Sequence, residues 1–419
     1  MSDGESGDIQ DLRHVLEITR RLAVELDLRT LLELIIDRSV ELLGADRGCL
    51  WLYDSAAHEL YSSVATGVEE IRFPADQGIA GAAVRSGQVQ NVPDAYADKR
   101  FYREIDRQTG YRTRTILALP LRDYQGETVG VLQIINKHAG PFTAADEHLA
   151  ETLAAQAGVA LQRARLMDHY ARKQEMERAM AIAREIQQSL LPQRTPNLPG
   201  YELAGFNKAA DDTGGDTYDF LPLDDGCCML TVADATGHGI GPALVIAEAR
   251  AMLRAIARKD ADVSTVLEAM NELLHEDLRD ERFVTCFLGV LDSSTHRLTY
   301  ASAGHGPMLF YSADRDEFQQ VNATGLPLAI LEDAEYDTRI EHEFAPGDFV
   351  VVLTDGFFEA DSPSGEMFGM DRVMELLREN RDRPVEEMID RLHQAVRAHA
   401  GSLPQGDDLT AVILRRGRS

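Results

Sequence analysis

The sequence predicts an α+β protein in which a long helix joins two domains. Its 419 residues, 44% of them hydrophobic, are enough for two or three domains with buried cores. Residues 144–190 contain one glycine and no proline, which favours a single uninterrupted helix. Apolar runs typical of strands lie on both sides of that segment, without the strict strand–helix alternation of a doubly wound sheet. We therefore expect mostly antiparallel sheets.

The part that precedes the long helix is predicted to contain a helix and then several strands. Over residues 9–43, apolar side chains recur every three or four positions, which is the spacing of an amphipathic helix. Residues 1–8 show no such pattern and are predicted to be a disordered tail. Four β-type runs follow, separated by Gly, Asp or Pro turn signals, at residues 49–53, 59–64, 116–121 and 128–135.

A group of prolines predicts where the long helix ends. Proline cannot continue a helix, and three prolines lie within residues 192–199. We assign residues 9–165 to the first domain, 166–196 to a helical linker or switch segment, and 197–417 to the second domain. In the second domain we expect strands at 227–233, 287–291, 349–354 and 410–414, and helices at 241–258, 263–278, 371–379 and 384–400.

Charge and cysteine content exclude several classes of function. The chain has 42 basic and 70 acidic residues, a net charge of −28, so its surface should repel nucleic acid and anionic membranes. No apolar run is long enough to cross a bilayer and the N-terminus lacks a secretory pattern, so we expect a cytoplasmic protein. The four cysteines include no C-x-x-C pair, which argues against a disulfide scaffold or a cysteine-rich zinc site.

Four acidic turns in the second domain indicate a metal centre. Asp216 follows two glycines, Asp234 and Asp355 close apolar strands, and Asp407 with Asp408 directly precedes a strand. Each such turn alone is more often structural. Strand ends can nevertheless bring carboxylates that are distant in the sequence into one rigid site. Carboxylate oxygens suit magnesium or manganese, and two such ions would offset the repulsion between the carboxylates.

The acidic turns belong to a series of short motifs. In chain order these lie at residues 186–192, 214–220, 234–239, 303–307, 325–328, 354–360 and 407–410. Together they resemble the SpoIIE-type, RsbU-like branch of the metal-dependent protein phosphatases, the PPM superfamily, over about residues 180–415. The resemblance implies an α/β/β/α sandwich that removes phosphate from phosphoserine or phosphothreonine in proteins.

The resemblance also implies a role for each acidic turn. Asp216, Asp234, Asp355 and Asp407 would bind two Mn²⁺ or Mg²⁺ ions, with Asp234 as the bridging ligand. The backbone carbonyl of Ala235 would be a further ligand. The ions would activate a water molecule that attacks phosphorus, so that no covalent phosphoenzyme is needed.

Neighbouring motif residues would support these ligands. Gly237, Gly356 and Asp408 would shape and hold the metal loops. His238 is interpreted either as the proton donor to the leaving group or as a turn residue that fixes the glycine loop, whereas His305 is expected to pack structurally. The phosphate-binding arginine that animal enzymes of the superfamily carry near their first metal ligand has no counterpart at that place.

Another motif lies where the first domain meets the long helix. Asn136 and Lys137 precede Phe142 and the pair Asp146 and Glu147. This pattern resembles that of GAF domains that bind cyclic nucleotides, in which an antiparallel sheet is flanked by helices. An ion pair between Lys137 and Asp146 would lock a strand to the following helix, so the motif itself is mainly structural.

The ligand of this GAF-like domain is left open between a cyclic nucleotide, another small molecule and none. We expect its pocket wall to include residues 77–84, Asn91, Asp94, Phe101 and Thr115.

The leading interpretation is a metal-dependent protein phosphatase under the control of a GAF sensor. Its implied substrate is a phosphorylated STAS-type anti-anti-sigma protein. The alternatives are a non-enzymatic ligand sensor or docking module, and a phosphatase of a different phosphoprotein outside sigma-factor control. A long helix can pass rotation or dimer changes from sensor to enzyme, with residues 186–190 at the junction. Helices over 9–43 and 144–190 are expected to form a homodimer.

Overall fold

The computed structural model describes residues 27–62, 71–223, 226–278, 282–336 and 340–418. The chain divides into two compact units, Met1–Glu175 and Met176–Ser419, whose boundary lies inside helix α5. The predicted tail at 1–8 and the first part of the predicted helix at 9–43 lie outside the described residues. No helix in the described part is long and apolar enough to cross a membrane.

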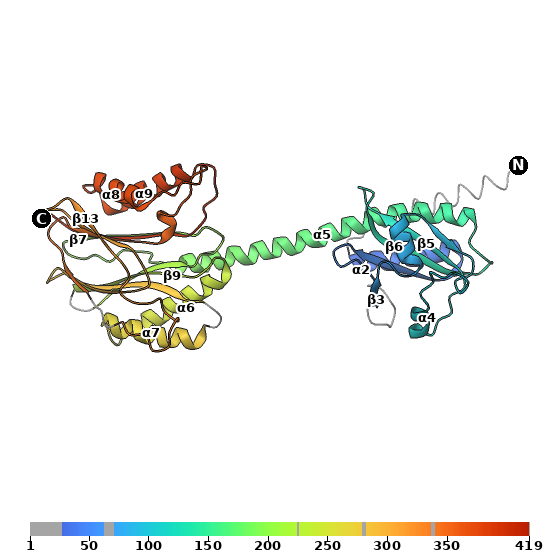
Figure 1. The fold of residues 1–419 in the computed structure, drawn as a ribbon, viewed down its shortest axis with the longest axis horizontal. Helices are drawn as coiled ribbons and strands as arrows, with labels where there is room; N and C mark the ends of the chain where they lie inside the picture. The colour runs from blue at the N-terminus through green and yellow to red at the C-terminus, as the bar shows by residue number, and fades with distance from the viewer. Residues whose placement is uncertain (1–26, 63–70, 224–225, 279–281, 337–339, 419) are drawn as a thin grey trace. The chain divides into compact units, whose positions relative to one another are not determined.

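A six-stranded antiparallel sheet of order β3-β2-β1-β6-β5-β4 forms the centre of the first unit (Figure 1). Its strands are β1 (Ala45–Asp54), β2 (Glu59–Ser62), β3 (Ile71–Pro74), β4 (Gln90–Val92), β5 (Ile116–Arg122) and β6 (Thr128–Lys137). The helices are α2 (Leu28–Leu43), α3 (Gly78–Ser86), α4 (Arg103–Thr109) and α5 (Ala144–Leu190). The predicted antiparallel sheet with flanking helices is confirmed, as is the uninterrupted long helix of 47 residues.

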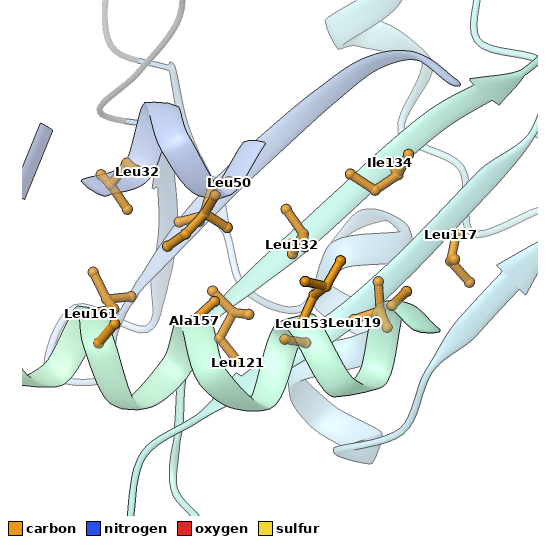
Figure 2. Packing of buried hydrophobic residues seen from close by; sticks show 14 of the residues in the cluster. Leu32, Leu50, Leu117, Leu119, Leu121, Leu132, Ile134, Leu153, Ala157 and Leu161 are labelled. Atoms are coloured by element: carbon orange, nitrogen blue, oxygen red, sulfur yellow. The ribbon is translucent and has the colours of Figure 1, made fainter. Parts of the chain in front are cut away.

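Strand alternation divides the buried side chains of the first unit into two cores. Leu50 and Leu132 lie on the face of the sheet that α2 and the first half of α5 cover (Figure 2). Trp51 lies between Leu50 and Leu52 and therefore points to the other face, where it packs with residues of α3 and α4. The sheet is thus buried on both faces.

The single glycine of the long helix lies where the helix touches the sheet most closely. Gly158 is buried, and a Cβ atom placed on it would lie 2.0 Å from the backbone oxygen of Arg122 at the end of β5. A side chain there would push α5 away from the sheet. Close packing against β5 therefore explains why α5 carries a glycine here, although glycine destabilises a helix interior relative to alanine.

The second unit is a four-layer sandwich, as the sequence predicted. One sheet has the order β14-β11-β10-β9-β8 and the other β13-β12-β15-β16-β7. The strands are β7 (Tyr201–Lys208), β8 (Asp216–Pro222), β9 (Cys227–Ala235), β10 (Val284–Asp292), β11 (Arg297–Ala303), β12 (Met308–Ser312), β13 (Glu317–Val321), β14 (Ile340–Glu343), β15 (Phe349–Leu353) and β16 (Leu409–Arg416). Helices α6 (Ile240–Ile256) and α7 (Val263–Asp277) cover the first sheet, and α8 (Met370–Glu379) and α9 (Val385–Ala400) cover the second (Figure 1).

The side chains between the two sheets change from apolar to polar at one end of the strands. On β9, Leu230 and Val232 belong to the core between the sheets, and the next residue that faces the same way is Asp234. On β15, Val350 and Val352 are followed in the same way by Thr354. The same change places a polar layer at one end of the sandwich, made of Asn207, Asp216, Asp234, Thr285, Thr354, Asp408 and Thr410.

We expect Gly158→Ala to destabilise the first unit by about 1–3 kcal/mol, because overpacking against a backbone atom outweighs the better helix propensity of alanine. Trp51 is the only tryptophan of the chain and is buried in this unit, so its fluorescence during urea unfolding reports the loss. Val159→Ala, at a 49% exposed neighbour on the same helix, is the control and should change stability little. Equal midpoints for Gly158→Ala and the native chain would contradict the packing argument.

Candidate metal centre

The structure brings the four predicted acidic turns together at the polar end of the sandwich. Asp216 on β8 and Asp234 on β9 are directly opposite each other on neighbouring strands. Asp355 begins the short 3₁₀ helix η2 (Asp355–Phe357) after β15, and Asp407 and Asp408 directly precede β16, the strand that pairs with β15. We call these five aspartates the carboxylate cluster.

The members of the carboxylate cluster act on one another through their charges. Burial, followed by the nearby charges of Asp234 and Asp408, raises the pKa of Asp216 well above its usual value. Burial and then the charge of Asp355 raise the pKa of Asp234 to about 7, although a hydrogen bond with Asp216 opposes the rise. Burial and then the charge of Asp407 raise the pKa of Asp355 in the same direction. A cation placed among these groups would relieve the repulsion.

The donors fit a hard divalent cation by their chemistry. Across the described ranges, no group of three or more His, Cys, Asp or Glu side chains is arranged so that it could hold a metal ion as it stands. The cluster nevertheless offers only carboxylate oxygens, the ligands that Mg²⁺ and Mn²⁺ prefer. The carbonyl of Ala235 lies at its edge, because a Cβ on Gly215 would be 2.6 Å from that oxygen.

Asp408 holds the loops together with its own carboxylate. Its Oδ1 accepts the backbone N–H of Ala210 at 2.7 Å, and its Oδ2 accepts that of Asp216 at 3.3 Å. A Cβ on Gly214 would lie 2.2 Å from Oδ2, and a Cβ on Gly356 would lie 2.2 Å from the backbone oxygen of Asp408. Both glycines are therefore required for close packing around this aspartate. Asp407 is exposed.

A hydrogen-bonded chain of uncharged side chains orients Asp216. The hydroxyl of Thr354 donates to Asp216 Oδ2 at 2.8 Å and accepts the backbone N–H of Thr410 at 2.9 Å. Asn207 Nδ2 donates to Thr410 Oγ1 at 2.8 Å. The sequence analysis gave none of these three residues a role, although Thr354 and Thr410 lie within its motifs at 354–360 and 407–410. The signal that could have found them is their place at the inward-facing end of each strand.

His305 connects the two sheets beneath the cluster. Its Nε2 lies 3.1 Å from the carbonyl of Leu353 on β15, and its Nδ1 lies 3.1 Å from the hydroxyl of Thr285 on β10. A carbonyl only accepts, so Nε2 carries the proton and Nδ1 accepts from Thr285. Burial lowers the pKa of His305 to about 4, so the ring is neutral. Thr285 pairs with Asp234, and Leu353 precedes Asp355 by two residues, so this connection fixes the spacing of both strands.

His238 lies outside the carboxylate cluster. Its side chain is 86% exposed, and its Nδ1 lies 3.1 Å from Asp211 Oδ2. Gly237 and Gly239 on either side have φ angles of 93° and 88°, which favour glycine, so the turn itself needs both of them. The role of His238 as a proton donor or as a turn residue stays a prediction.

The end of helix α5 is hydrogen-bonded to the loop that leads to Asp216. Gln187 Nε2 donates to the carbonyl of Gly214 at 2.6 Å, and Gln187 Oε1 accepts the N–H of the same residue at 3.0 Å. Arg184, one turn earlier, lies 3.6 Å from Asp212. The last turns of the long helix therefore contact the backbone of the first acidic turn directly.

In the first unit, the GAF-like motif forms the predicted lock. Lys137 pairs with Asp146, which also accepts the N–H of Thr143 at 2.6 Å and so starts helix α5. Asn136 adopts a φ of 57° and accepts the N–H of Arg114 at 2.6 Å. Phe142 is buried in the core of Figure 2. Glu147 accepts from Asn91 Nδ2 at 2.7 Å, so Asn91 ties β4 to α5 instead of lining a pocket.

A cavity of about 120 Å³ lies between the sheet of the first unit and helices α3 and α4. Of the expected wall, residues 78–80 and Phe101 line it, whereas Asp94 caps a turn and Thr115 accepts the N–H of Lys137. Half of the other wall residues are aromatic or aliphatic, among them Trp51, Phe73, Tyr102, Ile105 and Ile135, and the polar ones are Arg47, Asp106, Thr113 and Gln133. A larger cleft of about 610 Å³ in the second unit lies at the other end of β8 and contains no member of the carboxylate cluster.

Comparisons with known proteins agree with this architecture. Residues 224–417 match the family model of stage II sporulation protein E (SpoIIE), and residues 27–161 match that of the GAF domain. The chain is 28% identical over 244 residues to the phosphoserine phosphatase RsbU of Bacillus subtilis (strain 168), covering 58% of this chain and 72% of that protein. The SiaA-PP2C domain of Pseudomonas aeruginosa superposes with a TM-score of 0.53 at 25% identity, over 58% of this chain and 98% of that one.

Part of the chain is also similar to a much longer protein. It is 35% identical over 158 residues to a probable 3′,5′-cyclic phosphodiesterase, pde-5, of Caenorhabditis elegans. That match covers 34% of this chain and 22% of the phosphodiesterase, so most of that protein has no counterpart in it.

We expect Asp408→Asn to loosen the loop before Asp216, because an amide that replaces the carboxylate can leave a buried N–H without an acceptor, at about 1–3 kcal/mol. Hydrogen exchange at Ala210 and Asp216 in the metal-free chain should become faster. Asp407→Asn, at the exposed neighbour, is the matched control and should leave this exchange unchanged. Equal effects of both substitutions would show that Asp408 has no special place in the packing.

The neutral state of His305 predicts a pH dependence of stability. Its pKa is lower in the folded chain, about 4, than the ordinary 6.5, so the unfolded chain binds the extra proton. Stability is therefore fully present above pH 6.5 and falls by up to about 1.4 kcal/mol per pH unit between 6.5 and 4. His305→Gln keeps a donor and an acceptor and should lack this part of the decrease. Urea unfolding followed by circular dichroism at pH 7, 6 and 5 gives the free energy of unfolding of both proteins. The same dependence of this free energy on pH in both proteins would refute the role of His305.

Proposed function

Because the chain joins a GAF domain to a SpoIIE-type phosphatase domain of the PPM superfamily, we propose that it is a metal-dependent phosphatase of phosphoserine and phosphothreonine in proteins, controlled by the GAF domain. The observation that carries this proposal is the convergence of Asp216, Asp234, Asp355 and Asp407 at one end of the sandwich, where burial and the charges of neighbouring aspartates raise the pKa values of the first three. Buried charges of one sign are expensive unless counter-charges accompany them.

The residues proposed to hold two Mn²⁺ or Mg²⁺ ions are these four aspartates and the carbonyl of Ala235. When bound, the ions would supply an activated water and positive charge for phosphate-ester hydrolysis. The chain's own part is to hold the ligands in place. Thr354 fixes the carboxylate of Asp216, and Asp408 fixes the backbone around it.

The substrate and the leaving-group chemistry are inferred from the similarity to RsbU and from the position of His238. Similarity to RsbU, named a phosphoserine phosphatase, supports a phosphoserine protein as substrate, and we propose a STAS-type anti-anti-sigma protein. His238 would donate a proton to the leaving oxygen, and its exposed ring beside Asp211 is open to a protein substrate. A different phosphoprotein is the alternative.

Control by the GAF domain would act through helix α5 and the bonds of Gln187 to Gly214. We propose that a ligand or a change in a homodimer alters the last turns of α5, and so the loop before Asp216. The cavity of about 120 Å³ favours a small, mostly apolar ligand over a cyclic nucleotide. Arg47, a cation in the wall of this cavity, is stacked on Tyr111, with its guanidinium carbon 4.3 Å from the centre of the ring.

The phosphatase proposal predicts manganese-dependent hydrolysis of a phosphoserine peptide and of para-nitrophenyl phosphate by the full chain. Chelator should abolish turnover, and Asp234→Asn should lower it by about 100-fold or more, because a metal ligand is lost. Asp314→Asn, at an exposed acid outside the carboxylate cluster, is the control. Absence of turnover together with absence of manganese binding by calorimetry would favour the non-enzymatic docking module instead.

The regulatory proposal predicts that Gln187→Leu changes turnover by about 5–150-fold, the range of allosteric coupling energies of 1–3 kcal/mol. The direction of the change tells whether the contact activates or inhibits. Gln188→Leu alters the exposed neighbour on the same helix and should leave turnover unchanged. Hydrogen exchange at Gly214 should rise in the first variant alone, and identical exchange in both would rule out the contact as a switch.

A further inference from the structure

A cleft of about 350 Å³ opens directly beside the carboxylate cluster. Gly356 and Asp407 line it and also belong to the acidic turns, so the cleft and the candidate centre are continuous. One wall comes from residues 359–361 after η2. The other comes from the end of helix α9 and the loop that leads to Asp407.

The floor and rim of the cleft are largely apolar. Ala360, Val396, Ala400, Leu403 and Pro404 contribute to it, and Leu403 is 36% exposed. An apolar surface of this kind next to a charged centre suits the side chain of a polypeptide better than a free phosphate ion.

Arg397 on α9 gives the cleft a cation that has no partner. Within the described part of the chain, its guanidinium makes no hydrogen bond or ion pair. By contrast, Arg391 on the same helix pairs with Glu387, and Arg372 on α8 pairs with Glu366. Three acids, Glu359, Asp361 and Asp407, line the same cleft, but within the described residues none of them forms an ion pair with Arg397. This half-buried guanidinium is therefore available for an acidic group from outside.

Two other polar side chains belong to that wall, Gln405 and the proposed metal ligand Asp407, and Gln405 is already engaged. Gln405 Nε2 donates to the carbonyl of Lys208 at 2.8 Å and to that of Asp407 at 2.9 Å. These bonds fix the loop between α9 and Asp407. Arg397 is therefore the cationic group of the cleft lining that can bind an acidic group of a ligand.

We propose that this cleft is the substrate subsite that binds the residues next to the phosphorylated serine or threonine. An apolar side chain of the substrate would lie on the floor near Leu403, and an acidic side chain would pair with Arg397. The inference rests on the proposed phosphatase function and adds the class of sequence that the enzyme prefers. The end of α9 and the wall at 359–361, which flank the acidic turns in the sequence, thus supply specificity.

The test compares three substrates with the manganese-loaded full chain. They are a phosphoserine peptide with a flanking leucine and glutamate, the same peptide with glutamine in place of glutamate, and para-nitrophenyl phosphate, which is too small to reach the cleft. Arg397→Gln should lower kcat/KM about tenfold for the glutamate peptide and leave the other two substrates unchanged. Arg391→Gln is the matched control and should change none of them.

Two further variants sharpen the result. Arg397→Glu should prefer a peptide with lysine in place of glutamate, which a merely structural role of Arg397 would not produce. Leu403→Ser should lower kcat/KM for both leucine peptides and spare the aryl phosphate, and Leu403 is exposed enough to be replaced without unfolding.

Two outcomes would overturn the proposal. An equal loss on para-nitrophenyl phosphate would place Arg397 at the phosphate itself, and unchanged peptide kinetics would show that the cleft is not used. If the native chain hydrolyses nothing, the proposed function fails separately. Fluorescence polarisation of the labelled phosphopeptides then tests whether the cleft binds the substrate. Equal affinity of the native chain and Arg397→Gln for the glutamate peptide would refute the proposed subsite.

Discussion

The electrostatic cost of burying carboxylates between two sheets is the constraint on which the second unit depends. Asp216 is almost fully buried and lies opposite Asp234, so the two cannot both be charged without compensation. The chain compensates in part, with the hydroxyl of Thr354 on Asp216 and backbone N–H groups on Asp408. The pKa values of Asp216 and Asp234 remain raised all the same, and cations bound as proposed would complete the compensation.

The sandwich provides the rigid frame that holds these groups against their repulsion. The same strands that bury Val232 and Val352 in the apolar core carry Asp234 and Thr354 at their ends. A strand that moved would therefore have to disrupt the core as well as the cluster. The neutral His305 adds a direct link between the two sheets at this end, made with one donor and one acceptor and without any charge.

The sequence was informative where a feature depends on neighbours in the chain. The acidic turns, the helix over 144–190 and the pair of Lys137 with Asp146 are of this kind, because glycine turns, helix breakers and short spacings act locally. The resemblance implied that Asp408 holds the metal loops, but its partners Ala210 and Asp216 could not be derived from the sequence, since they depend on how the segment before β16 meets the loop before β8. The misplacement of Asn91 has the same origin, because its partner Glu147 is 56 residues away.

The size of the contact between α5 and the cluster suits regulation better than stability. Gln187 makes two hydrogen bonds to one peptide unit, worth about 1–3 kcal/mol together. That is small against the sandwich core, so the unit folds with or without it, but it equals the coupling energy that shifts a two-state equilibrium by 5–150-fold. Gly214 cannot carry a side chain because Asp408 occupies the space, so its peptide is exposed to Gln187 on one side and fixed by the cluster on the other. A change in the helix therefore reaches the first proposed metal ligand two residues later through backbone alone.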